Sequence, residues 1–358
     1  MTHTLPLPEF AHERVEVITG RRSGLFIAVA LHSSVLGSAL GGARLWTYPH
    51  WSDALGDALR LSAAMTLKNA AAGLDAGGGK SVIGLSEGQT LDADRRRAAF
   101  LDLGDAVESF GGLYRTAEDV GSTTDDMLVV SERTAHVVGL PDAVGGSGEP
   151  AGPTSLGVYA SLRAVLERIA GSGDVAGRRI TISGLGQVGG RLAARLAQEG
   201  AVLTVTDVFA GKRELAESLG ATWVEPGEEH RVSADVFVPA GIGGLLTDEV
   251  IDALDARAVC GPANNPLADR SGAERLAARG VLYAPDFVVN AGGVIYLDLE
   301  AKKLGTREQI MDRVAGIGDT VRLILEQAEE RGVTPLAAAE ERAAARLRAG
   351  ALAGSARS

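Results

Sequence analysis

The stretch RRITISGLGQVGGRLAARL, residues 178–196, decides the fold of the second half of the chain. Its β-branched start predicts a strand over 179–183, and its alanine- and leucine-rich end predicts a helix through Gln198. The GxGxxG pattern between them is typical of a dinucleotide-binding turn, because glycine lets the backbone approach a pyrophosphate at a helix N-terminus. The next predicted strand, 201–206, ends on Asp207, where a carboxylate can bind ribose hydroxyls.

The position of Asp207 favours NAD over NADP, because a carboxylate repels the 2′-phosphate of NADP. Lys212 and Arg213 follow closely and weaken that preference. The alternative is a glycine-rich turn in an α/β protein that binds no cofactor. We predict that NAD is bound by Gly184, Gly186, Gln187, Val188, Gly189 and Asp207.

Outward from this motif, short apolar runs at 234–238 and 258–260 predict further buried parallel strands. Residues 141–153 are rich in proline and glycine and predict a linker. We therefore expect an α/β protein of two domains, with an active-site cleft between them. The substrate and oligomerisation domain is expected to comprise residues 1–145 with the C-terminal helices 325–358, and the Rossmann-type, doubly wound NAD-binding domain residues 146–324.

The first domain is also predicted to mix strands and helices. Apolar, β-branched runs predict strands, and apolar residues at helical spacing predict helices. The predicted strands are 13–19, 25–31 and 81–84, and the predicted helices are 51–71 and 91–111.

Lys80 follows three glycines and directly precedes the predicted strand 81–84, an unusual place for a solvated charge. If Lys68 converges on it, repulsion between two ammonium groups favours a neutral lysine, which can act as a general base. Glu118 and Asp119 would point to opposite sides of an extended chain, so one carboxylate could face a cleft. Taken alone, the GGGK segment is also compatible with a phosphate-binding turn, and the EDVG segment with an ordinary turn.

The composition describes a globular protein with an acidic surface. The 358 residues carry a net charge of −11, which argues against nucleic-acid and membrane-surface partners. The single cysteine, Cys260, and a start without an apolar signal region favour a cytoplasmic protein. The six histidines are scattered, so we predict no metal site, and a 2-hydroxy-acid dehydrogenase lacks support.

Taken together, these segments resemble the Glu/Leu/Phe/Val amino-acid dehydrogenases, in particular the leucine, valine and phenylalanine branch. The resemblance runs in order along nearly the whole chain. The segments that carry it are LGSALGGARLW (36–46), MTLKNAAAGLDAGGGKSVIGL (65–85), TAEDVGSTTDDM (116–127), GLGQVGGRLA (184–193), CGPANNPLAD (260–269) and APDFVVNAGGVIYL (284–297).

The resemblance implies NAD-dependent oxidative deamination of an amino acid by a homo-oligomer, with a role for each matched residue. Lys80 resembles the catalytic lysine that activates water, and Asp119 the aspartate that handles the amino-group protons. Lys68 resembles the lysine that pairs with the substrate carboxylate. The other matched positions are Gly41 and Gly42 at the substrate, Thr154 at the nicotinamide carboxamide, and Asn264 and Asn290 near the nicotinamide and the substrate carboxylate.

The expected substrate is a small aliphatic L-amino acid, because the matched wall positions resemble those of aliphatic-specific relatives. Two alternatives stay open, a phenylalanine dehydrogenase and a catalytically inactive NAD-binding protein of the same fold. A methylene is worth only about 1–3 kcal/mol in such pockets, so leucine and valine are not separated. The wall positions are Leu40, Ala117, Val294 and Leu297.

Overall fold

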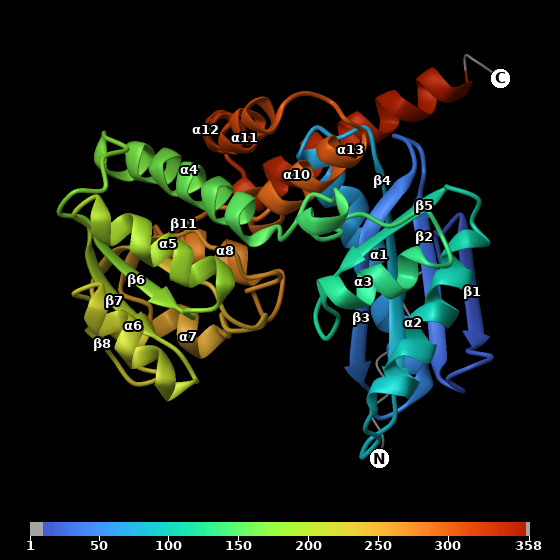
Figure 1. The fold of residues 1–358 in the computed structure, drawn as a ribbon. Coiled ribbons are helices and arrows are strands. Elements are labelled where there is room, and N and C mark those ends of the chain that lie inside the picture. Colours follow the sequence, from blue (N-terminus) through green and yellow to red (C-terminus); the bar gives the residue numbers. More distant parts are fainter. Residues whose placement is uncertain (1–9, 356–358) are drawn as a thin grey trace. The chain divides into compact units, whose positions relative to one another are not determined.

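The computed structural model describes residues 10–355, which form two compact units (Figure 1). Within the described residues, the first unit runs to Glu149 and also includes Leu297–Leu304 and the chain from Ala343 onward. The second unit comprises Pro150–Tyr296 and Gly305–Arg342. The division falls inside two helices, α10 (Gly292–Ala301) and α13 (Pro335–Ser355), so each contributes residues to both units.

The first unit is built on a mixed five-stranded sheet in the order β1-β2-β4-β3-β5. β1 and β4 both pair antiparallel with β2, whereas β3 pairs parallel with β4 and β5. The strands predicted at 13–19 and 25–31 are confirmed. The strands are β1 (Arg14–Thr19), β2 (Phe26–Ser33), β3 (Ala39–Thr47), β4 (Gly77–Leu85) and β5 (Tyr114–Glu118).

Helices cover both faces of this sheet. Helix α1 (Trp51–Ala71), predicted at the same residues, packs on β4 and β2 through a small-residue cluster that includes Ala54, Ala58 and Val82. The opposite face packs on α2 (Ala93–Glu108) and α3 (Thr124–Ser131) through a larger core that includes Phe100. Burial on both faces accounts for the continuous apolar run of β2.

The glycine run before Lys80 lies inside the sheet. The sequence predicted a strand only from Ser81, but β4 begins at Gly77, and Lys80 pairs with Ala30 of β2. A Cβ on Gly78 would lie 2.1 Å from the backbone nitrogen of Thr66 in α1. Glycine is therefore required here for packing, since it lets the helix touch the strand backbone.

The second unit contains a parallel six-stranded sheet in the order β11-β10-β9-β6-β7-β8. All five pairings are parallel, and read from the third strand of the unit the order is 3-2-1-4-5-6, as in the Rossmann fold. The predicted Rossmann-type fold is confirmed. The strands are β6 (Arg179–Ser183), β7 (Val202–Thr206), β8 (Thr222–Trp223), β9 (Ala234–Pro239), β10 (Ala256–Val259) and β11 (Leu282–Tyr283).

Helices alternate with these strands. The predicted helix through Gln198 is confirmed. A further helix begins at Ala151, so the end of the predicted linker, residues 141–153, is helical. No described helix is long and apolar enough to cross a membrane. The helices are α4 (Ala151–Ala170), α5 (Gln187–Gln198), α6 (Arg213–Ser218), α7 (Asp248–Ala253), α8 (Gly272–Ala278), α9 (Asp286–Val289), α11 (Arg307–Ala315) and α12 (Ile317–Arg331).

The contact between α1 and β4 predicts unequal costs for two glycine substitutions in one strand. Gly78→Ala forces its methyl group onto helix backbone, so we expect the free energy of unfolding to fall by about 1–3 kcal/mol or more. Gly84→Ala is the matched control, because its Cβ would meet only side-chain carbons of Ala54 and Phe26 at 3.2 Å. Urea unfolding followed by tryptophan fluorescence measures both, and equal stabilities would contradict the close packing.

Candidate active site

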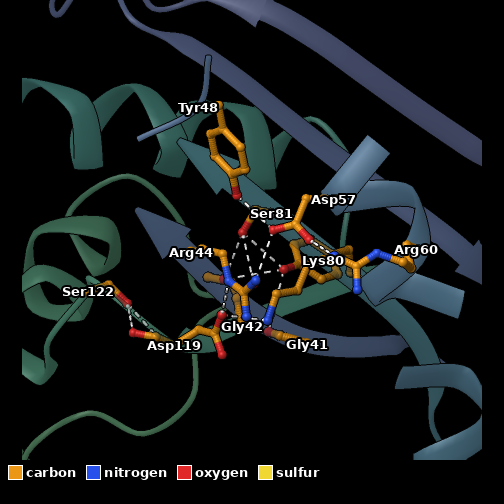
Figure 2. A network of polar contacts seen from close by, with 12 residues as sticks. Gly41, Gly42, Arg44, Tyr48, Asp57, Arg60, Lys80, Ser81, Asp119 and Ser122 are labelled. Carbon is orange, nitrogen blue, oxygen red and sulfur yellow. Dashed lines mark hydrogen bonds and ion pairs between the residues drawn. The ribbon is translucent and has the colours of Figure 1, made fainter. Parts of the chain in front are cut away.

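Lys80 lies in the middle of β4, on the same face as Gly78 and Gly84, which both lie close to α1. Figure 2 shows Lys80 beside Asp119. Its side chain is only 5% exposed, and its ammonium contacts Oδ2 of Asp119 at 2.8 Å. An ammonium carries three donors, and no second acceptor for it is seen among the described residues. A buried cation with unused donors is therefore available to bind water or a substrate.

Asp119 directly follows β5 and receives two cations on one oxygen. Arg44, from β3, donates through Nε to the same Oδ2 at 3.0 Å. Burial alone would raise the pKa of the Asp119 carboxyl, but the Lys80 ammonium and the Arg44 guanidinium outweigh burial and hold that pKa below its usual range. Both cations thus approach the carboxylate at the same oxygen, Oδ2.

The neighbouring carboxylate has a different environment. Glu118 points to the other side of the extended chain, where Thr124 of α3 donates to it at 3.1 Å. Burial raises the pKa of Glu118. The two adjacent acids thus differ in the direction of their pKa shift, and Asp119 is the one that is held ionised beside a lysine.

A second carboxylate anchors Arg44 from behind. Asp57 of α1 accepts from Nη1 of Arg44 at 2.9 Å and from the hydroxyl of Tyr48 at 2.7 Å, both on Oδ2. The exposed Arg60 pairs with its other oxygen. Burial would lower the pKa of Arg44, yet the two carboxylates outweigh burial and raise it. The guanidinium is therefore a fixed cation between two anions.

Gly41 and Gly42 make room for this cluster. A Cβ on Gly42 would lie 2.7 Å from the Cβ of Asp119, and one on Gly41 would lie 1.8 Å from the carbonyl oxygen of Gly79. Any side chain at Gly42 would push the carboxylate away from Lys80. Both glycines also pair with β5, where Gly42 lies opposite Ala117.

Other expected substrate residues lie on the same unit. Leu40 and Ala117 share a sheet face with Gly42, because neighbours in register on parallel strands point the same way. Leu297 is buried, and its side chain lies beside Gly139. Lys68 lies eleven residues after Asp57, close to three full turns, and so on the same side of α1.

In the second unit, the glycines of the motif each have a structural reason. Gly184 has φ of 113°, and its Cβ would meet the backbone of Ala240 at 2.8 Å. Gly189 lies so close to Gly184 that a Cβ would approach its carbonyl oxygen at 2.1 Å. Gly186 caps α5 and faces open space. The backbone at the helix N-terminus, including Gln187 and Val188, is thus open to a phosphate.

Asp207 shapes the same turn. Its carboxylate accepts from the backbone nitrogens of Leu185 at 2.7 Å and of Phe209 at 2.8 Å. A carboxylate has about four acceptor positions, so capacity for ribose hydroxyls is left. The dinucleotide fits these residues.

Two asparagines form a pair near the ends of β10 and β11. Asn290 donates through Nδ2 to Oδ1 of Asn264 at 2.9 Å and to the carbonyl oxygen of Pro262 at 3.1 Å. Its own Oδ1 is buried and makes no hydrogen bond within the described residues. An unused buried acceptor suits a carboxamide donor such as that of nicotinamide. Thr154 lies in the first turn of α4, beside Gly293 of α10, and Val294 is half-buried in α10.

The sequence did not point to Arg44, Asp57 or Tyr48. The available signal was the alternation of Leu40, Gly42 and Arg44 along one face of a strand, but 39–47 is glycine-rich and was not predicted as a strand. No spacing rule links a strand arginine to an aspartate thirteen residues later.

The Rossmann sheet with its glycine turn and the paired Lys80 and Asp119 define the class as a nucleotide-dependent dehydrogenase. The profile described as Glu/Leu/Phe/Val dehydrogenase, dimerisation domain, matches residues 11–136, and that described as Glutamate/Leucine/Phenylalanine/Valine dehydrogenase matches 203–352. The chain belongs to this family, which confirms the resemblance seen in the sequence. It is an amino-acid dehydrogenase, an oxidoreductase acting on CH–NH2 donors, and the family uses a pyridine nucleotide.

The relatives include several substrate classes. The chain is 38% identical to a leucine dehydrogenase of Thermoactinomyces intermedius, over 95% of this chain and 92% of that protein. It is 39% identical to a valine dehydrogenase of Streptomyces albus (94% and 92%) and 38% identical to a phenylalanine dehydrogenase of Bacillus thermotolerans (94% and 89%). The crystal structure of L-tryptophan dehydrogenase from Nostoc punctiforme matches with a TM-score of 0.80 and 35% identity, over 95% of this chain and 96% of that chain.

Removing the Asp119 charge should destabilise the first unit in a pH-dependent way. Asp119→Asn leaves two cations beside a neutral amide, and we expect a loss of about 3–5 kcal/mol in the free energy of unfolding near neutral pH. Because the pKa of Asp119 is lowered by folding, the wild-type advantage is present above the unfolded value and disappears as the pH falls through the folded one.

The measurement is urea unfolding of wild type and Asp119→Asn from pH 7 down to about pH 3. Glu87→Gln, which removes an exposed carboxylate, serves as the control and should change stability little at any pH. A wild-type advantage that grows as the pH falls would contradict the ion-pair assignment.

Proposed function

We propose that the chain catalyses the NAD-dependent oxidative deamination of a small aliphatic L-amino acid to the 2-oxo acid, ammonia and NADH. The observation that carries this proposal is the buried Lys80–Asp119 pair, in which the ammonium of Lys80 and the guanidinium of Arg44 both approach Oδ2 of the carboxylate. The first unit is proposed to bind the amino acid, and the second unit the nucleotide.

In the first step, Asp119 handles the amino-group protons of the substrate. Its lowered pKa keeps the carboxylate ionised, and Oδ1 is the oxygen proposed to meet the substrate ammonium. Transfer of one proton to Asp119 gives the neutral amine, whose lone pair assists loss of hydride from Cα. Lys68 is proposed to pair with the substrate carboxylate and to fix the position of Cα.

In the second step, Lys80 acts as general base towards water. Loss of hydride leaves a substrate iminium. The Lys80 ammonium first passes one proton to solvent, and the resulting amine takes a proton from water as the water oxygen adds to the iminium carbon. Asp119 returns its proton to the amino nitrogen. The C–N bond then breaks as the added hydroxyl group loses its proton to solvent, which releases ammonia and the 2-oxo acid. Water supplies the oxygen of the product.

The nucleotide is proposed to be held by the backbone of Gly184, Gly186 and Gly189, by Asp207 and by the unused Oδ1 of Asn290. When bound, the nicotinamide ring supplies the acceptor for the hydride. The carboxylate of Asp207 supports the preference for NAD over NADP, because a 2′-phosphate would be repelled.

The small aliphatic preference rests on the wall of the first unit. Leu40 and Ala117 are both buried and share the face of the sheet that holds Lys80. They offer apolar contact and no partner for a charged side chain. We also propose that the chain forms a homo-oligomer through its first unit, consistent with the dimerisation description of the profile over residues 11–136.

A substrate screen tests the proposed reaction. Purified protein is incubated with each of the twenty L-amino acids and with NAD or NADP in parallel, and absorbance at 340 nm is followed. We expect the highest kcat/KM with leucine, valine or isoleucine and NAD. A preference for phenylalanine or tryptophan would overturn the assignment of an aliphatic substrate. If neither NAD nor NADP is reduced with any amino acid, the proposed reaction is wrong.

Lys80→Ala tests the proposed base. We expect kcat for deamination to fall by about 10²- to 10⁴-fold, because general acid–base catalysis is lost, while NADH binding measured by fluorescence stays unchanged. Arg97→Ala, which removes an exposed cation paired with Glu132, is the control and should keep wild-type turnover. Wild-type turnover of Lys80→Ala would refute the mechanism.

A further inference from the structure

The side chain of Arg44 links the candidate catalytic pair to helix α1. Its Nε contacts Asp119 and its Nη1 contacts Asp57, at 3.0 and 2.9 Å (Figure 2). The two nitrogens are held at fixed positions in the planar guanidinium, so the aspartate on one side sets the position of the aspartate on the other. Lys80 then meets the same Oδ2 that Arg44 holds.

We propose that Arg44 is a positioning residue for the proposed deamination, which holds the Asp119 carboxylate against Lys80 and is itself fixed by Asp57 and Tyr48. This inference rests on the proposed function of Asp119 and Lys80, and it adds three residues to which neither a motif nor the resemblance gave a role. Arg44 acts through Asp119 and is assigned no contact with substrate.

The burial of the anchor supports this role. Asp57 is only 8% exposed, and its Oδ2 accepts from both Arg44 and Tyr48. Burial raises the pKa of the Tyr48 hydroxyl, and the adjacent Asp57 raises it further, so the phenol remains a hydrogen-bond donor. A buried carboxylate that accepts two hydrogen bonds on one oxygen has little freedom to move. Its contact with Arg44 therefore restrains the position of the guanidinium.

The charges around Asp119 come from every element packed near it. Lys80 faces it from β4 and Arg44 from β3, and Asp57 of α1 acts through Arg44. Tyr114 of β5 lies on the other face of the sheet, bonded to Ser81, and burial raises its pKa to about 12, so it stays neutral. Arg44 is therefore one of the two cations that hold Asp119 ionised.

The test compares Arg44→Met and Arg44→Lys in the full chain. Without the guanidinium, the pKa of Asp119 rises, so the acidic limb of kcat/KM against pH should move up by about one pH unit. We expect kcat/KM at the optimum to fall about 10- to 100-fold in Arg44→Met, since a small displacement of a catalytic group has this effect. Lysine keeps the positive charge but cannot bridge two carboxylates. Arg44→Lys should therefore bring the acidic limb of the pH profile closer to that of wild type than it brings kcat.

Tyr48→Phe and Asp57→Asn give the same test if Arg44→Met fails to fold. Each keeps Arg44 but removes one hydrogen bond or charge that fixes it. Each should therefore move the acidic limb of kcat/KM to higher pH by less than Arg44→Met does. Arg60→Ala is the matched control, because Arg60 pairs with the same aspartate from a side chain that is 60% exposed. Its pH profile and kcat should match those of wild type.

A second readout separates this proposal from the proposed function. Infrared difference titration follows protonation of the Asp119 carboxyl directly, with the band assigned by its loss in Asp119→Asn. If wild type oxidises no amino acid, the proposed function fails, yet the carboxyl should still titrate at higher pH in Arg44→Met. If wild type is active and Arg44→Met keeps the wild-type pH profile, kcat and carboxyl titration, the positioning role of Arg44 is refuted.

Discussion

One carboxylate oxygen, Oδ2 of Asp119, is shared by an ammonium and a guanidinium, and the first unit is arranged around that contact. Two cations in a nearly closed site repel one another and lose hydration, so neither is stable there without an anion between them. Asp119 supplies that anion for Lys80 and Arg44 together. The desolvation cost of burying the Lys80 ammonium in the sheet is therefore offset by Asp119 after β5, which Arg44 of β3 and Asp57 of α1 hold in place.

The contact in turn depends on backbone without side chains. Gly42 leaves the space that Asp119 occupies, and Gly78 lets α1 approach β4 closely enough for Asp57 to lie within reach of Arg44. A methyl group at either glycine would change a distance on which the charges depend. The packing of this unit therefore determines its electrostatics, because the glycines set the distances between the charged groups.

The fold of the second unit was predictable because its signals are local. Strand, glycine turn, helix and terminal Asp207 lie within thirty residues, and each glycine has a separate steric reason in the structure. In the first unit, β1, β2 and α1 were predicted from periodicity, whereas β3 was missed and the start of β4 was placed at Ser81. Their glycines weaken the strand pattern, and they are needed because of partners distant in sequence, which no local rule detects.

The same limit applies to the candidate site. Lys80 and Asp119 were recognisable because each lies in a distinctive segment, and Arg44 lies in one of those segments too. Its importance depends on Asp57 and Tyr48, which belong to an ordinary amphipathic helix and the turn before it. Only the paired geometry of β3 and α1 brings them together.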